Sequence, residues 1–214
     1  MAFTVPASLQ KPADRGWRLG LTGGMGSGKS TALAVFKKEG WLVMEADLIA
    51  RNLLNEDPSI RDALEDKWGS QVFAAAGSVD RAFVGSQVFS SPECLRWLEG
   101  LLHPRVRECW SHAFETASER NAVIEIPLLF EKDLHVHFDA TVCLALSHEL
   151  QIQRLAGRGV DRESAEKRLA KQLPTYEKTK RADFVFSNEG SVAFLAEQVR
   201  SFIGALEGSI IPPS

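Results

Sequence analysis

Residues 23–30 read Gly-Gly-Met-Gly-Ser-Gly-Lys-Ser, and this stretch sets the expectation for the rest of the chain. It satisfies the pattern Gly-x-x-x-x-Gly-Lys-Ser/Thr of a phosphate-binding loop. The short run Leu-Gly-Leu-Thr at 19–22 precedes it and reads as a strand, and a helix is expected directly after it. Glycines let the backbone turn its N–H groups toward an anion, and the helix N-terminus adds a partial positive charge. The sequence therefore predicts a site for the phosphates of ATP or GTP.

The side chains of this motif have separate expected roles. Lys29 should reach the β- and γ-phosphates, and Ser30 should ligate Mg²⁺. The alternative is a glycine-rich turn that binds nothing, but motif and context agree and both key side chains are present. The other residues expected to contact ATP from the loop are Gly24, Gly26, Ser27, Gly28 and Thr31.

Composition excludes some classes of partner. The 214 residues carry a formal net charge of −3, which gives no bulk electrostatic case for a nucleic-acid or membrane partner. Three scattered cysteines lack zinc-site spacing and suit a reducing cytoplasm. Residues 1–16 contain no apolar run, and we expect a flexible extension there. The oligomeric state is left open between a monomer and a small homo-oligomer.

The strand pattern predicts an α/β fold. Several of the apolar runs are continuous rather than alternating, which is typical of strands buried on both faces of a parallel sheet. Helical stretches separate them, so we expect a P-loop kinase three-layer sandwich around a five-stranded parallel sheet. The expected strands are 17–22, 41–45, 122–126, 140–146 and 184–186.

Two insertions interrupt this order. A first helix is expected at 29–38, and a second near Asp47, which is a good N-cap type. Between 58 and 118 the strand signal disappears, and helices are expected at 58–68, 80–88, 92–102 and 104–117. We expect a nucleotide-binding core (17–57 with 119–148 and 181–214), a helical substrate domain (58–118) and a mobile, surface-exposed lid (149–180).

Residues beyond the loop narrow the class of P-loop protein. A GTPase would need an Asn-Lys-x-Asp element, and no Asn of this chain is followed by Lys. A motor or large ATPase would need a longer chain, so a small-molecule kinase is expected. Arg154 and Arg158 are four residues apart and should share one helix face, where cations can neutralise a transferring phosphoryl group. The alternative is a charged, solvated helix stabilised by pairs with Glu163 and Glu166.

Asp47 is the candidate catalytic carboxylate. It follows the apolar run 41–44, and the carboxyl ends of parallel strands face the ligand crevice. A carboxylate there can accept a hydrogen bond from an acceptor hydroxyl and help to remove its proton. A plain helix N-cap is the alternative, and the two roles can coexist.

Further motifs occur in a defined order along the chain, and together with the phosphate loop they resemble the dephospho-CoA kinase family from about Arg18 to Gly204. The phosphate loop alone is shared by many families, and the combination is much more specific. The motifs are Leu-Thr-Gly-Gly-Met-Gly-Ser-Gly-Lys-Ser-Thr (21–31), Glu-Ala-Asp-Leu-Ile-Ala-Arg (45–51), Leu-His-Pro (102–104) with Arg107, Ile-Pro-Leu-Leu-Phe-Glu (126–131), Gln-Ile-Gln-Arg-Leu (151–155) with Arg158, and Arg-Ala-Asp-Phe (181–184) with Asn188.

The resemblance implies a reaction and a set of roles. ATP would phosphorylate the ribose 3′-hydroxyl of 3′-dephospho-CoA with the help of Mg²⁺, giving coenzyme A and ADP. Asp47 would be the catalytic carboxylate, Arg154 and Arg158 would belong to a lid over ATP, and Asn188 would lie near the adenine. The residues implied on the CoA side are Thr22, Arg51, His103, Arg107, Pro127 and Leu128.

Two alternatives stay open at this point. A kinase for another small hydroxylated substrate, such as a nucleoside or nucleotide, would share the phosphate loop without needing the CoA-side motifs. A non-catalytic nucleotide-binding module would not need Lys29, Ser30 and Asp47 together. The chain also departs from the family pattern, because Glu45 and Glu125 stand where Asp is usual. Each change keeps the charge and adds one methylene beside the phosphate loop.

Overall fold

The computed structural model describes residues 3–6, 9 and 13–208 and contains a five-stranded sheet in the order β2-β3-β1-β4-β5. Strand β1 pairs in parallel with β3 and β4, and β4 pairs in parallel with β5. The α/β prediction and all five strand predictions are therefore confirmed. The strands are β1 (Arg18–Gly23), β2 (Leu42–Glu45), β3 (Ala122–Glu125), β4 (Ala140–Ala145) and β5 (Phe184–Ser187).

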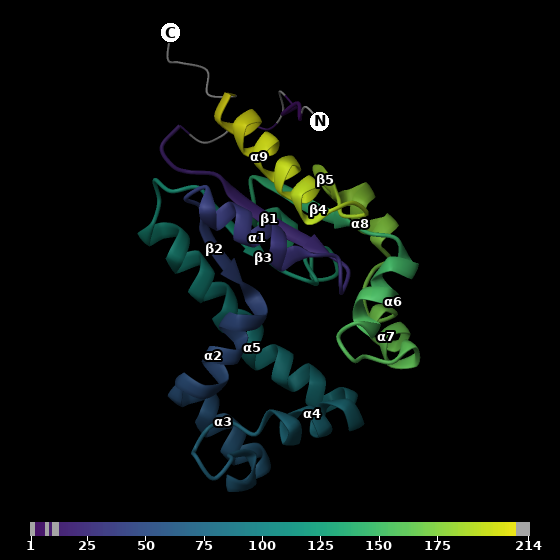
Figure 1. The fold of residues 1–214 in the computed structure, drawn as a ribbon. Coiled ribbons are helices and arrows are strands. Elements are labelled where there is room, and N and C mark those ends of the chain that lie inside the picture. The colour runs from purple at the N-terminus through teal and green to yellow at the C-terminus, as the bar shows by residue number, and fades with distance from the viewer. Residues whose placement is uncertain (1–2, 7–8, 10–12, 209–214) are drawn as a thin grey trace. The chain divides into compact units, whose positions relative to one another are not determined.

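Helices cover both faces of this sheet. Helices α1 (Lys29–Lys38) and α9 (Val192–Gly208) pack on each other and on the strands, with Val142 and Leu144 of β4 in their shared core (Figure 1). Successive side chains of a strand point to opposite faces. Cys143 therefore faces the other side, where α8 (Thr175–Arg181) packs on β4 and β1. The result is the predicted three-layer arrangement.

The chain divides into two compact units. The first comprises Met1–Met44 and Ala117–Ser214, and the second comprises Glu45–Thr116. The second unit thus begins earlier than the predicted residue 58, because α2 packs against α3 and α5. Its helices, with the 3₁₀ turn η1 (Ser70–Val72), are α2 (Ala46–Glu56), α3 (Pro58–Trp68), α4 (Arg81–Ser90) and α5 (Pro92–Thr116). The remaining elements of the first unit are η2 (Leu134–His137), α6 (His148–Ala156) and α7 (Arg162–Leu169).

The helix break predicted at Pro104 in the second unit is wrong. The sequence predicted separate helices at 92–102 and 104–117, but α5 runs through Pro104 without a break. A proline in a helix removes the hydrogen bond to the carbonyl four residues earlier, here that of Gly100. The helix nevertheless continues, because α5 packs against both α2 and α4. The predicted start of α3 at Pro58 is confirmed, and α4 begins at Arg81, one residue after the predicted start. Asp57 and Asp80 are the N-caps and accept hydrogen bonds from backbone N–H groups of the first turns.

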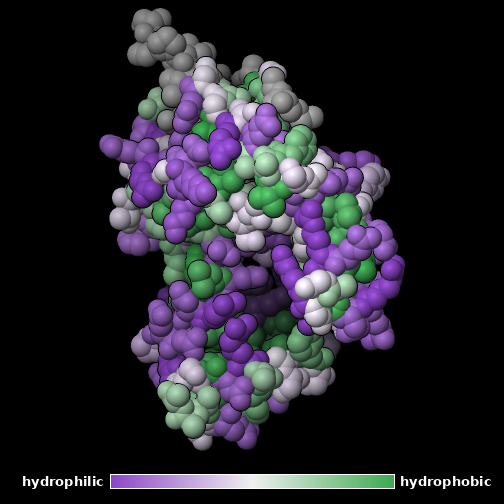
Figure 2. Space-filling model, in the orientation of Figure 1, coloured by the Kyte–Doolittle hydropathy of each residue, from purple (hydrophilic) through white to green (hydrophobic). Residues whose placement is uncertain are grey.

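Each unit has its own apolar core. The second unit buries Ile60, Leu64, Val72, Val79 and Val84. On the face shown in Figure 2, hydrophilic and hydrophobic residues are interspersed over each unit. Among the helices of the described residues, none has the length and apolar character that crossing a bilayer requires.

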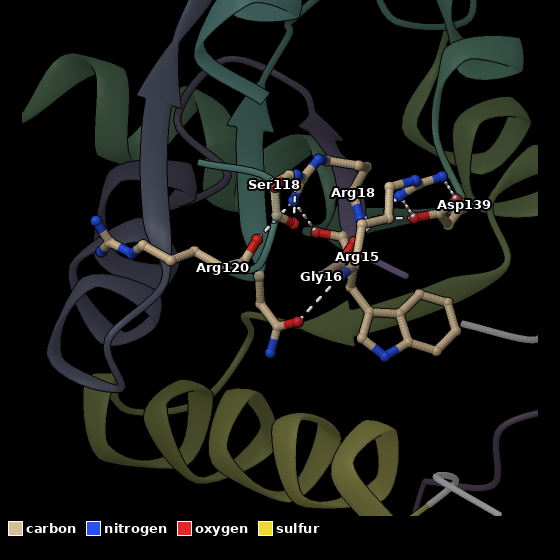
Figure 3. A network of polar contacts seen from close by, with 8 residues as sticks. Arg15, Gly16, Arg18, Ser118, Arg120 and Asp139 are labelled. Atoms are coloured by element: carbon tan, nitrogen blue, oxygen red, sulfur yellow. Dashed lines mark hydrogen bonds and ion pairs between the residues drawn. The ribbon is translucent and has the colours of Figure 1, made fainter. Parts of the chain in front are cut away.

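A polar network fastens the start of β1 (Figure 3). The Arg15 guanidinium forms two hydrogen bonds to the Asp139 carboxylate, 2.7 and 2.8 Å long, and Asp139 also accepts one from the backbone N–H of Arg18. The Arg18 side chain is buried and donates to the carbonyl oxygens of Ala117, Ser118 and Arg120. Arg18 therefore holds the chain where it re-enters the first unit after α5.

The expected N-terminal extension packs on the core through Phe3, Val5 and Leu9. The Phe3 ring lies 5.4 Å from the Phe186 ring and 5.7 Å from the Phe202 ring, centroid to centroid. The flexibility expected for this segment stays a prediction, and its residues 1–2, 7–8 and 10–12 lie outside the described residues.

The aromatic cluster around Phe202 yields a stability prediction. Phe202 is fully buried on α9, and its ring centroid lies 4.7 Å from that of Phe184 and 5.3 Å from that of Phe186. We expect Phe202→Ala to lower the free energy of unfolding by about 3–5 kcal/mol, because it removes buried apolar area and leaves a cavity. Urea unfolding measures this change. The exposed Val192→Ala on the same helix should change it by less than about 0.5 kcal/mol, and equal effects would contradict the prediction.

Candidate active site

The loop between β1 and α1 has the backbone shape of an anion site. Gly23, Gly26 and Gly28 adopt φ values of 148°, 78° and 92°, a region that L side chains rarely occupy. Gly28 caps α1 in a left-handed conformation, so the first N–H groups of the helix lie at the end of the loop. Free N–H groups and the helix dipole together favour phosphate at such a position. The predicted phosphate loop is therefore present as a backbone structure.

Lys29 is folded back onto this loop. Its Nζ donates hydrogen bonds to the carbonyl oxygens of Gly23 (3.1 Å) and Gly24 (3.2 Å) and lies 3.5 Å from Glu125 Oε1. The Ser27 Oγ is buried without a hydrogen-bond partner among the residues that the structure describes. Ammonium and hydroxyl groups are both potential donors to phosphate oxygens. The loop thus holds a cation and an unused hydroxyl beside its backbone donors.

The residues near the loop can hold a magnesium ion. Ser30 is exposed at the second position of α1, and Glu125 is buried at the end of β3, paired in register with Leu21. Mg²⁺ prefers oxygen ligands and usually keeps few of them from the protein, the rest being water and substrate phosphate. The Ser30 hydroxyl would be such a protein ligand. In the described part of the chain, no group of three or more His, Cys, Asp or Glu side chains could form a metal cage of its own.

Asn188 and Arg154 come together at the far end of the loop. The Asn188 Nδ2 donates to the Ser27 carbonyl oxygen (2.7 Å), and the Arg154 Nη2 donates to the Asn188 carbonyl oxygen (2.8 Å). A Cβ atom added to Gly28 would collide with Asn188 Nδ2, so the pair packs directly on the loop. Asn188 and Arg154, which the sequence predicts as site residues from two distant segments, are therefore neighbours of the phosphate loop.

Arg158 does not share the helix face of Arg154. Helix α6 ends at Ala156, and the backbone N–H of Arg158 donates to Leu155 O in the turn after it. The predicted shared face is wrong, because the helix stops at Gly157 before it reaches Arg158. The ion pairs expected for the alternative, a charged and solvated helix, do occur on α7, where Arg162 pairs with Glu166 and Lys167 pairs with Glu163.

The segment after β3 is fastened to β1. Thr22 is fully buried one residue before the loop, and its Oγ1 donates to the Pro127 carbonyl oxygen at 3.2 Å. Pro127 and Leu128 are half-buried. The predicted substrate contacts Thr22, Pro127 and Leu128 therefore form one connected patch beside the phosphate loop.

The remaining predicted residues lie in the second unit. Asp47 and Arg51 are exposed on α2, and His103 and Arg107 are exposed on α5, each pair at the four-residue spacing of one helix face. Helices α2 and α5 pack against each other. The N-cap prediction for Asp47 is wrong, because α2 begins at Ala46 with Glu45 as its N-cap. Asp47 lies in the first helical turn, where the helix dipole favours a carboxylate.

Two buried polar residues of this region escape prediction from sequence. Gln151 donates from Nε2 to Leu146 O and Thr175 Oγ1, and a Cβ added to Gly24 would lie 2.7 Å from its Oε1. Gln151 and Gly24 line a cavity of about 710 Å³ between β4, α6, α7 and α8. Lys178 is fully buried and pairs with Glu131. In the sequence, the burial of these residues is indicated only by a polar residue at an apolar helical position. That pattern does not identify the group with which the residue pairs.

Comparisons with known proteins show which family the chain resembles in sequence and in fold. A family model described as dephospho-CoA kinase matches residues 17–193. The dephospho-CoA kinase of Syntrophotalea carbinolica is 34% identical over 198 residues, which cover 91% of this chain and 92% of the relative. The crystal structure of TT1252 from Thermus thermophilus has a TM-score of 0.77 and 31% identity over 90% of this chain and 98% of that one. The dephospho-CoA kinase structure from Campylobacter jejuni has a TM-score of 0.69 and 24% identity over 91% and 98%, which supports the fold.

The contact between Gly28 and Asn188 yields a binding prediction. We expect Gly28→Ala to raise the Kd for Mg·ATP at least about tenfold, because its Cβ meets both an unfavourable φ and the Asn188 amide. Isothermal titration calorimetry measures this change. Gly204→Ala is the control, since a Cβ there meets nothing within 4 Å. It should leave the Kd unchanged and stabilise α9 by about 0.5–1 kcal/mol, and an unchanged Kd for Gly28→Ala would overturn the prediction.

Proposed function

The chain belongs to the dephospho-CoA kinase family, and we propose that it transfers the γ-phosphate of ATP to the ribose 3′-hydroxyl of 3′-dephospho-CoA. The products are coenzyme A and ADP, and the reaction is the last step of coenzyme A synthesis. The observation that carries this proposal is the Lys29 ammonium, held 3.1 Å from the Gly23 carbonyl oxygen inside a loop of the required backbone shape. Phosphoryl transfer depends mostly on such positioning and charge stabilisation.

The ATP phosphates lie on the loop in this proposal. The backbone N–H groups of Gly24, Gly26, Ser27, Gly28 and Thr31 donate to the phosphate oxygens. Lys29 exchanges its carbonyl contacts for the β- and γ-phosphates, which are stronger acceptors because they are charged. Asn188 and Arg154 lie beside the adenosine end, which their contacts with the loop and with each other support.

Ser30 holds a magnesium ion in this proposal. Bound Mg²⁺ would neutralise negative charge on the β- and γ-phosphates. The carboxylate of Glu125, 3.5 Å from Lys29 Nζ, orients that ammonium and accepts hydrogen bonds from water around the site.

Asp47 accepts the proton of the acceptor hydroxyl in this proposal. The oxygen of the ribose 3′-hydroxyl attacks the γ-phosphorus, and the bond from that phosphorus to the β–γ bridging oxygen breaks. The hydroxyl proton passes to the Asp47 carboxylate. Arg51, His103 and Arg107 bind the anionic groups of dephospho-CoA, for which exposed basic side chains on α2 and α5 are suited. Thr22, Pro127 and Leu128 complete the acceptor contacts from the first unit.

The segment 149–180 acts as a lid through its part that carries Arg154 and Arg158. The surface exposure expected for the whole segment is wrong at its end, because α8 packs on β4 and β1 and Lys178 is fully buried. Arg154 and Arg158 supply positive charge as the phosphoryl group transfers, and closure of the lid keeps water from taking the phosphoryl group. Arg154 already contacts the loop, whereas Arg158 lies in an exposed turn that lid closure would have to bring in. We propose a cytoplasmic enzyme whose partners are ATP and dephospho-CoA.

A coupled ADP-release assay tests the proposed activity. ADP release with dephospho-CoA is compared with release in the presence of adenosine, AMP or no acceptor. Release only with dephospho-CoA supports the proposal. Release with adenosine or AMP would point to a nucleoside or nucleotide kinase, and no release with any acceptor would point to a nucleotide-binding module.

The role of Asp47 yields a kinetic prediction. We expect Asp47→Asn to lower kcat by about 10²–10⁴-fold, the usual contribution of an acid–base group, while the protein stays folded and loses at most about 1 kcal/mol of stability with the helix-dipole interaction. Asp62→Asn, at an exposed position of α3 in the same unit, is the matched control and should keep wild-type kcat. Near-normal turnover by a folded Asp47→Asn protein would rule out the assigned role.

A further inference from the structure

Lys178 is a charged residue that the reaction scheme leaves unused. Its side chain is fully buried on α8, beneath the sheet. Its Nζ lies 2.9 Å from Glu131 Oε1 and donates a 2.5 Å hydrogen bond to the Pro127 carbonyl oxygen. Burial lowers the pKa of Lys178, and the hydrogen bond and ion pair with Glu131 oppose that shift. A buried cation with two well-placed acceptors is a costly feature that simple packing would not require.

The Pro127 carbonyl is held from two sides. Thr22 Oγ1 donates to it from the end of β1, and Lys178 Nζ donates to it from α8. Thr22 immediately precedes the first glycine of the phosphate loop. The position of the Pro127–Leu128 peptide relative to the loop therefore depends on both donors.

Glu131 connects Lys178 to the segment between α7 and α8. Its Oε1 accepts a hydrogen bond from the backbone N–H of Leu173 (2.8 Å) in addition to the ion pair with Lys178. Leu173 lies in the segment 170–174 that joins α7 to α8. One carboxylate oxygen thus links the lid segment, the buried lysine and the chain after β3.

We propose that Lys178 is a positioning residue for the acceptor side of the reaction, acting through the Pro127 carbonyl and Glu131. It holds the Pro127–Leu128 segment against β1 and ties that segment to the base of the lid. This role rests on the proposed function, because Pro127 and Leu128 are acceptor contacts only in that scheme. ATP binding involves other atoms and should depend little on Lys178.

The alternative to exclude is a purely structural ion pair. Removing one partner of a buried pair leaves an uncompensated charge and destabilises a protein, whereas replacing both partners by apolar residues is often neutral or stabilising. The variants Lys178→Met and Lys178→Met/Glu131→Leu separate the two roles. The single variant should lower the melting temperature, and the double variant should recover it.

The kinetic test compares the effect of the variants on dephospho-CoA with their effect on ATP. In the double variant, we expect kcat/KM for dephospho-CoA to fall about 10–100-fold, the scale of a lost positioning contact, with the Kd for ATP changed less than about threefold. The single variant Lys178→Arg keeps the positive charge and the hydrogen-bond donors. It should keep most of the wild-type kcat/KM for dephospho-CoA. Lys38→Met, at an exposed position at the end of α1 in the same unit, is the matched control and should behave as wild type.

Two results would overturn the proposal. One is a double variant that recovers both its melting temperature and its wild-type kcat/KM for dephospho-CoA. The other is an equal loss of affinity for ATP and for dephospho-CoA in a folded variant. Failure of the proposed function itself is distinguishable, because the wild-type protein would then release no ADP with dephospho-CoA in the same assay.

Discussion

Backbone N–H groups can hold a multiply charged anion only where the chain turns sharply enough to aim several of them at one point. Gly23, Gly26 and Gly28 make that turn with positive φ, and the first turn of α1 completes it. The surroundings are built around the glycines of the loop: a Cβ on Gly28 would collide with Asn188, and a Cβ on Gly24 would collide with Gln151. The loop, the end of β5 and the start of α6 therefore depend on one another.

The second recurring constraint is the cost of burying charge. Lys29 is largely buried and Lys178 is fully buried, and the structure supplies each with oxygen atoms: carbonyls and Glu125 for Lys29, and Pro127 O and Glu131 for Lys178. Glu125, at the end of β3, thus pairs with Lys29, and Glu131, six residues later, pairs with Lys178. In the proposed scheme the first pair serves ATP and the second serves the acceptor side.

Errors of the sequence predictions have local physical causes. Pro104 was expected to start a helix, but packing of α5 on α2 and α4 outweighs the loss of one hydrogen bond. Asp47 was expected at an N-cap, but the N-cap is Glu45, so the helix begins two residues earlier, directly after β2. Arg158 was expected on the face of Arg154, but Gly157 ends α6 between them. In each case the residue types were compatible with two local structures.

The amino-acid sequence alone was enough to predict the α/β class, the five strands and the phosphate loop, because these depend on local patterns: continuous apolar runs, glycine spacing and a lysine beside a serine. It also carried the separated motifs by which the family is recognised. The three-dimensional structure was needed to show that Asn188 and Arg154 meet at Gly28, and that Lys178 is buried against Glu131 and Pro127. Those contacts join segments far apart in the chain. The packing of the elements determines which polar groups pair, and the neighbouring residues in the sequence do not.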